Sequence, residues 1–131
     1  MALLNFTAID VETSNHDRAS ICQIGMAVVR DSEVKDVIAE IIDPQDFFDP
    51  VNVGIHGISE DDAVGRPTFR EFFPTLERVV EAYPIASHTF FDRTSLNGAC
   101  EKSGCRHASN PWVDSATVAR RCWPDLFGAS G

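Results

Sequence analysis

The spacing of apolar and polar residues predicts three strands in the first third of the chain. Leu3–Asp10 and Ile21–Arg30 are apolar runs of strand length, and Glu33–Ile42 alternates polar with apolar residues. A two-residue turn joins the last two runs, and Pro44 ends the third. We therefore expect the second and third strands to form an antiparallel hairpin.

Helical and strand patterns alternate in the rest of the chain. Six apolar residues recur at helical spacing after Pro67 and predict a helix that contains Pro74. Ser59, followed by three acids, predicts the start of a short helix, whereas residues 45–54 are expected to be irregular. The remaining predicted elements are the strand Pro84–His88, the helix Asp92–Lys102, the strand Trp112–Asp114 and the helix Ser115–Cys122. This order predicts an α/β fold with an antiparallel start and parallel strands after it.

Length and composition indicate one soluble globular domain spanning residues 1–131. No apolar run is long enough to span a membrane, and the first ten residues lack the features of a secretory signal. The four cysteines are scattered, which predicts reduced thiols and a cytoplasmic location. Cys100, Cys105 and His107 lack the paired spacing of a zinc site.

The formal net charge of −9 comes entirely from one segment, residues 31–62, and the rest of the chain is balanced. Screening in physiological salt limits the reach of such charge to about 10 Å. The acidic segment is therefore interpreted as a solvated surface, and it does not exclude nucleic-acid binding elsewhere on the molecule.

Two carboxylates, Asp10 and Glu12, stand at the end of the first predicted strand. Residues two apart on a strand point to the same side, so these two acids aim at one point. Like charges that close repel each other unless a cation or a shared proton intervenes, and Mg²⁺ prefers oxygen ligands. The alternative is a strand that runs out into solvent with two exposed acids.

A third carboxylate, Asp92, follows the fourth predicted strand at the start of a helix. It could serve only as the N-cap of that helix. If the first and fourth strands are parallel neighbours, however, Asp92 lies beside Asp10 and Glu12. Three carboxylates would then face one cavity, which is enough for a two-metal site.

Four segments together resemble the DEDD superfamily of exonucleases, in the branch that includes the proofreading epsilon subunit of bacterial replicative DNA polymerase. AIDVET is similar to the first motif of the family, and SHTFFDR is similar to the second. Between these motifs stands VGIHGISEDDAVGRPTF, which is similar to the His-Gly-Ile segment of that branch. After the second motif comes WVDSATVARRCWP, which is similar to the segment that follows it in the family. The resemblance covers nearly the whole chain, and its segments occur in the family's order.

The resemblance implies a ribonuclease H-like fold, with a mixed sheet of strand order 3-2-1-4-5 flanked by helices. It also implies 3′→5′ exonucleolysis of single-stranded DNA or RNA ends with two Mg²⁺ or Mn²⁺ ions, and a polymerase subunit as a further partner. The residues that it assigns are the metal ligands and catalytic residues Asp10, Glu12 and Asp92, and the substrate-binding residues Thr13, His56 and His88. Thr89 departs from the family pattern, which has Asn after this His.

The third motif of the family, a general-base His five residues before an Asp, does not follow Asp92 in this sequence. His56 and Asp61 have that spacing but precede the second motif. We therefore expect a C-terminally incomplete domain, slower by about 10²- to 10⁴-fold than one with the base. The alternatives are a catalytically silent module of the same fold, which binds nucleic acid or a polymerase, and an unrelated acidic interaction domain.

Several basic and aromatic residues could contact nucleic acid, but structural roles are favoured for them. Trp112 and Trp123 are expected to lie in the core, although either could stack on a base. The basic candidates, expected to be ordinary surface arginines, are Arg93, Arg106, Arg120 and Arg121.

Overall fold

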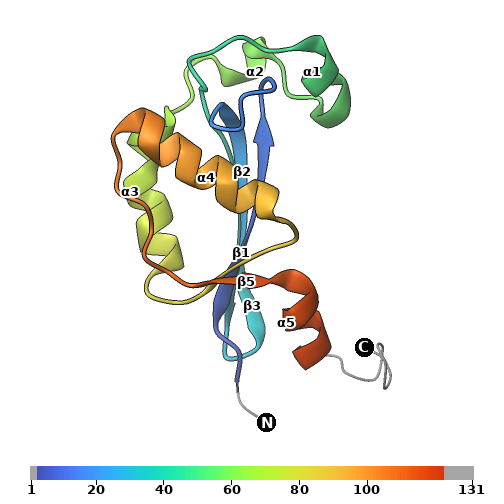
Figure 1. Cartoon of the computed structure of the whole chain (residues 1–131), viewed down its shortest axis with the longest axis vertical. Coiled ribbons are helices and arrows are strands. Elements are labelled where there is room, and N and C mark those ends of the chain that lie inside the picture. Colours follow the sequence, from blue (N-terminus) through green and yellow to red (C-terminus); the bar gives the residue numbers. More distant parts are fainter. Residues whose placement is uncertain (1–2, 123–131) are drawn as a thin grey trace.

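A five-stranded mixed sheet with helices around it makes up the computed structural model, which describes residues 3–122 (Figure 1). The strands are β1 (Phe6–Thr13), β2 (Ile21–Arg30), β3 (Glu33–Ile41), β4 (Ile85–Ser87) and β5 (Trp112–Asp114). The helices are α1 (Pro50–His56), α2 (Glu60–Ala63), α3 (Phe69–Val80), α4 (Phe90–Ser103) and α5 (Ser115–Cys122). Some of the possible nucleic-acid contacts lie outside the part that the structure describes, namely Trp123 and the side chains of Arg120 and Arg121.

The strand order is β3-β2-β1-β4-β5, which confirms the predicted order. Strand β2 pairs antiparallel with both β1 and β3, whereas β4 runs parallel to β1 and to β5. The parallel pairing of β1 with β4 is short and joins Thr7 to Ile85 and Ala8 to Ala86. The first and fourth strands are therefore neighbours, as the proposed carboxylate site requires.

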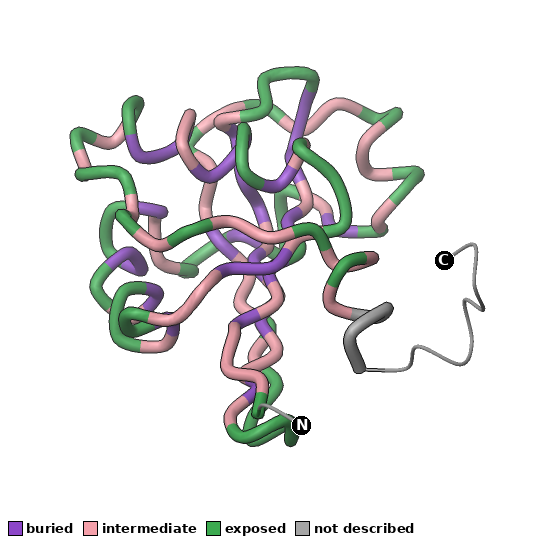
Figure 2. The backbone as a smooth tube through the Cα atoms, turned by 60° about the horizontal axis from the view of Figure 1, so that its bottom comes forward, coloured by how far each residue is buried: buried purple, intermediate pink, exposed green. Residues whose placement is uncertain are grey.

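The core lies between the sheet and helices α3 and α4, which cover one of its faces (Figure 1). Alternate residues of β1 enter this core, and Ile9 and Val11 are each only 3% exposed. They pair across the sheet with Met26 and Ile24 of β2, which are also buried. Figure 2 shows the buried positions gathered along the central strands and the inner sides of the helices.

Helix α3 forms despite the proline inside it. Thr68 caps its start, and the Thr68 and Glu71 side chains accept hydrogen bonds from each other's backbone N–H. Pro74 removes one backbone donor, but Pro74 and Arg70 are both exposed, so water reaches the carbonyl left without a partner. The expected helix is confirmed, and the proline neither ends nor splits it.

The structure corrects three local expectations. Residues 45–54 are not wholly irregular, because Asp49 caps α1, which continues to His56. Strand β1 does not end at Asp10 but runs on to Thr13. Helix α4 begins at Phe90 with Thr89 as its N-cap, so Asp92 is not the cap but lies in the first turn. None of the helices in the described part of the chain is long and apolar enough to cross a membrane.

Candidate active site

The short pairing of β4 with β1 leaves room for Asp92 beside β1. Beyond Ala8, the edge of β1 no longer pairs with β4. There the backbone N–H of Val11 donates to Oδ1 of Asp92 over 3.0 Å. Asp92 thus satisfies a backbone donor between Asp10 and Glu12, and it is only 4% exposed. The two motifs, 80 residues apart in the sequence, therefore meet at one point.

The three acids repel one another at this point. Burial raises the pKa of Glu12, and the charges of Asp10 and Asp92 raise it further, while His56 lowers it. Burial also raises the pKa of Asp92. The hydrogen bond from Val11 lowers this pKa in part, and the charge of Asp10 raises it further. A positive charge placed among them would relieve both effects.

The chemistry of these donors fits a divalent ion. Asp10 is exposed and Glu12 is half-buried, and within the described residues no group donates a hydrogen bond to either side chain. Hard cations such as Mg²⁺ prefer free carboxylate oxygens of this kind. Within residues 3–118, however, no three His, Cys, Asp or Glu side chains are already gathered into a group that could hold an ion. The carboxylates thus suit a divalent ion chemically, although their side chains are not gathered around one ion position in this structure.

A cavity of about 300 Å³ adjoins Glu12 and lies between the end of β1 and helix α1. Two predicted substrate residues, Thr13 and His56, line it together with Glu12. Phe91, which precedes Asp92, closes another side. The structure thus brings Thr13 and His56 together next to one of the predicted metal ligands.

Both ring nitrogens of His56 are engaged. Its Nδ1 accepts a hydrogen bond from the backbone N–H of Ile58 at 3.0 Å, so Nε2 carries the proton. This Nε2 donates to the carbonyl oxygen of Thr13 over 2.8 Å. His56 therefore holds the end of β1 through contacts of both ring nitrogens. The nearby Cys22 thiol has its pKa raised to about 12 by burial, so it stays protonated and is a poor nucleophile.

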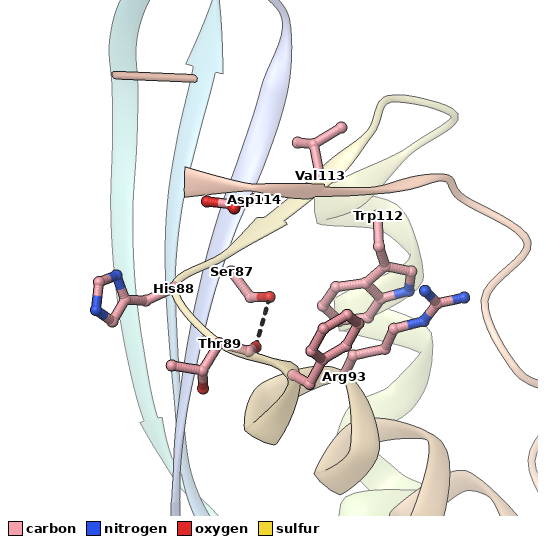
Figure 3. A pocket seen from close by; sticks show the side chains of 8 residues that line it. Ser87, His88, Thr89, Arg93, Trp112, Val113 and Asp114 are labelled. Carbon is pink, nitrogen blue, oxygen red and sulfur yellow. Dashed lines mark hydrogen bonds between the residues drawn. The ribbon is translucent and has the colours of Figure 1, made fainter. Parts of the chain in front are cut away.

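The third predicted substrate residue, His88, lies elsewhere. It is exposed and lines a different cavity of about 320 Å³ at the ends of β4 and β5 (Figure 3). Its Nδ1 lies 3.3 Å from the Ser115 hydroxyl, and its charge lowers the pKa of Asp92. The structure therefore places His88 near the carboxylates but not in the cavity of Thr13 and His56.

The sequence analysis missed two residues of the site. Asn52, on α1, donates to the carbonyl oxygens of Thr13 and Asn15, both over 3.2 Å. Arg18 lies over the ring of Phe91, 5.6 Å from its centroid, and lines the same cavity. The Asp49–Pro50 pair at the start of α1 and the glycine after it were a usable signal for the helix that carries Asn52. Nothing in the sequence pattern marks Arg18.

The geometry agrees with a sequence comparison. The profile of the family described as Exonuclease matches residues 7–130. The chain belongs to the exonuclease family. This confirms the predicted membership among DEDD 3′→5′ exonucleases, and the matched span includes the carboxylates of β1 and α4.

Curated relatives of this exonuclease-family chain include much longer polymerases. DNA polymerase III PolC-type of Halalkalibacterium halodurans is 25% identical over 124 residues, which is 92% of this chain and 9% of the relative. The protein of the same name from Clostridium perfringens is also 25% identical over 124 residues, covering 92% of this chain and 8% of the relative. The chain thus spans about a tenth of the length of these relatives.

Solved structures of exonucleases share the fold. Exonuclease X in complex with 5′-overhanging duplex DNA has a TM-score of 0.63 at 20% identity, over 90% of this chain and 64% of that one. Cell-death related nuclease 4 has a TM-score of 0.73 at 12% identity, over 97% of this chain and 50% of that one. At such identities the likeness shows the fold alone, and it confirms the ribonuclease H-like sheet.

Proposed function

We propose that this chain is a metal-dependent 3′→5′ exonuclease domain that hydrolyses terminal phosphodiesters of DNA or RNA. The observation that carries the proposal is the hydrogen bond from Val11 to Asp92, which brings the acids of β1 and α4 together. Membership of the exonuclease family supports the reaction class. The domain is proposed to span residues 1–131, and the cytoplasmic location expected from the cysteines stays a prediction.

The residues proposed to hold two Mg²⁺ or Mn²⁺ ions are Asp10, Glu12 and Asp92. Such ions, when bound, activate a water and stabilise the leaving 3′ oxygen. Asp92 is fixed by the Val11 N–H, whereas Asp10 and Glu12 present carboxylates without donors among the described residues. The terminal nucleotide is proposed to occupy the cavity beside Glu12, where Thr13 and Phe91 contact it.

His56 and Asn52 are proposed to support substrate binding indirectly. Both donate hydrogen bonds to the Thr13 carbonyl and hold the end of β1 against α1. They would keep Glu12 and Thr13 in place while the cleaved nucleotide leaves and the new 3′ end of the nucleic acid enters. His88 is proposed to contact the substrate from the other side of Asp92.

Slow turnover is part of the proposal, because no His-x4-Asp pair follows Asp92 in these 131 residues. A missing general base lowers the rate by about 10²- to 10⁴-fold. A second candidate is a silent module that binds nucleic acid or a polymerase, which the lack of a gathered metal-ligand group within residues 3–118 favours. The names of the PolC-type relatives support a polymerase as the partner in either case.

The test is Mn²⁺-dependent shortening of 5′-labelled single-stranded DNA and RNA by this chain. Asp10→Asn is expected to reduce the rate by about 10²-fold or more, since it removes charge stabilisation of the reaction. Asp31→Asn is the matched control, because Asp31 is exposed in the β2–β3 turn with φ 54°, a conformation that Asn adopts readily. Shortening that Asp10→Asn leaves unchanged would contradict the proposal, and a rate within tenfold of a homologue with the base would contradict the proposed slowness.

A further inference from the structure

A second cavity is lined by residues on either side of Asp92 in the chain and shares none of its lining with the cavity beside Glu12. Its volume is about 320 Å³, and it is formed by the start of α4 and the ends of β4 and β5. Figure 3 shows Trp112 and Arg93 on one side of it and Ser87, Thr89 and Asp114 around the rest. Of the residues that line it, the function proposed above uses only His88.

Two consecutive phenylalanines each line one of the two cavities. Phe91 lines the cavity beside Glu12, and Phe90 lines the second cavity. Asp92 follows them directly in the same turn of α4. A strand whose terminal phosphodiester lies at the carboxylates would therefore have one aromatic ring available on each side of the cleavage point.

The aromatic side chains of the second cavity are unusually open. Phe90 is 80% exposed, although phenylalanine is normally buried. Trp112 is half-buried and packs against the hydrophobic core, and the Arg93 guanidinium lies over its ring, 5.9 Å from the centroid. Exposed rings combined with an arginine are the usual surface on which single-stranded nucleic acids stack their bases.

Three polar side chains of the cavity make hydrogen bonds within the protein. The Asp114 carboxylate accepts a hydrogen bond from the Ala116 N–H, and the Thr89 hydroxyl accepts one from the Phe91 N–H. The Ser87 hydroxyl donates to the Thr89 carbonyl, as the dashed line in Figure 3 shows. The cavity therefore offers stacking surfaces beside polar groups that are in part already engaged within the protein.

The second cavity is continuous with the carboxylates through His88. His88 lines this cavity and also the hollow on the open face of the sheet that Asp10 lines. A polynucleotide could thus pass from the Glu12 cavity over the carboxylates and past His88 without leaving the surface.

We propose that this cavity binds a base upstream of the terminal nucleotide, stacked on Phe90 and Trp112. The inference rests on the proposed function, because it takes the terminal nucleotide to lie in the cavity beside Glu12. The stacking is tolerant of sequence, as a processing exonuclease requires when each nucleotide in turn reaches the same position. A protein partner that fills the cavity with an apolar side chain is the competing occupant.

The experiment measures binding of short single-stranded DNA and RNA probes by fluorescence anisotropy in Mn²⁺. The probes carry a phosphorothioate at the terminal linkage and a single abasic residue at the terminal, second, third or fourth position from the 3′ end. Losing one stacked base is expected to weaken binding by about 5- to 100-fold. We expect this loss at the terminal position and at one upstream position.

Phe90→Ala is expected to weaken binding of the intact probe by a similar factor and to abolish the upstream abasic effect only. The terminal abasic effect should stay as in the parent chain. Phe90→Trp should restore the upstream effect, which a merely structural role would not produce. Val64→Ala is the control, because Val64 is 74% exposed and lies outside both cavities.

Three results would overturn the inference. A parent chain that binds the probes but tolerates every upstream abasic residue overturns it, leaves the proposed function intact and points to the protein partner. An upstream effect that Phe90→Ala leaves unchanged places the base elsewhere. A parent chain that binds neither DNA nor RNA overturns the inference together with the proposed function.

Discussion

The two faces of strand β1 differ in what surrounds them. Ile9 and Val11 point into the core under α3 and α4 and are 3% exposed. Asp10 and Glu12 alternate with them on the other side, where Asp10 is exposed and Glu12 is half-buried. Burial of Ile9 and Val11 stabilises the fold, whereas Asp10 and Glu12 stay close together despite their electrostatic repulsion. A single strand thus supplies both the rigid support of the candidate site and two of its proposed metal ligands.

Substitution on the two faces should give the largest contrast. Ile9→Ala removes a buried side chain and is expected to lower the free energy of unfolding by about 2–5 kcal/mol. Val37→Ala, on β3, removes a side chain that is 72% exposed and should change it by about 0.5 kcal/mol or less. Urea denaturation of both variants measures the difference. Equal losses would show that the open face is as well packed as the covered one.

A smaller contrast is expected between the two histidines. His56→Ala leaves the Ile58 N–H without its partner and removes a donor from the Thr13 carbonyl, both in buried residues. The expected loss of stability is about 1–3 kcal/mol. His88 is exposed with one long contact to Ser115, so His88→Ala should cost less than about 0.5 kcal/mol. Thermal unfolding distinguishes the two, and a larger effect from His88 would contradict the account.

The carboxylates show the same difference between stabilised and strained positions. Hydrogen bonds from the Ser20 hydroxyl and the Phe47 N–H, with the Asn15 side chain nearby, hold the pKa of Asp46 at about 2. A lowered pKa stabilises the fold above the unfolded value near 3.9, and this contribution is lost as the pH falls towards 2. Asp46→Asn should remove on the order of 1 kcal/mol at pH 7 and flatten the acid limb of stability between pH 4 and 2. An unchanged acid limb would show that Asp46 contributes nothing.

Removing a charge from the site should have the smallest effect, with the opposite sign. Asp10 raises the pKa of both Glu12 and Asp92, so its charge destabilises the ion-free protein. Asp10→Asn should therefore raise the free energy of unfolding in EDTA by up to about 1 kcal/mol. Guanidinium denaturation of this variant beside Asp31→Asn measures the gain. A loss of stability would mean that the three acids do not repel one another.

The resemblance to the exonuclease family implied the strand order, and the meeting of the two motifs was expected on condition that β1 and β4 pair in parallel, as they do. Helix α1 escaped prediction because none of its residues is buried, so it has no apolar stripe and only its caps mark it. The hydrogen bond that holds Asp92 to Val11 also could not be predicted. It depends on where β4 stops pairing, which is a property of the assembled sheet. The roles of Thr13, His56 and His88 in substrate binding stay predictions.

The most direct test of the account is calorimetric titration of the chain with Mn²⁺, beside the Asp10→Asn/Asp92→Asn double variant and the Asp31→Asn control. Binding does not depend on a general base, so it tests the carboxylates themselves. We predict that the parent chain and the control bind Mn²⁺ and that the double variant does not. Equal binding by the parent chain and the double variant, or no binding by any of the three, would contradict the assignment of Asp10, Glu12 and Asp92 as the metal ligands.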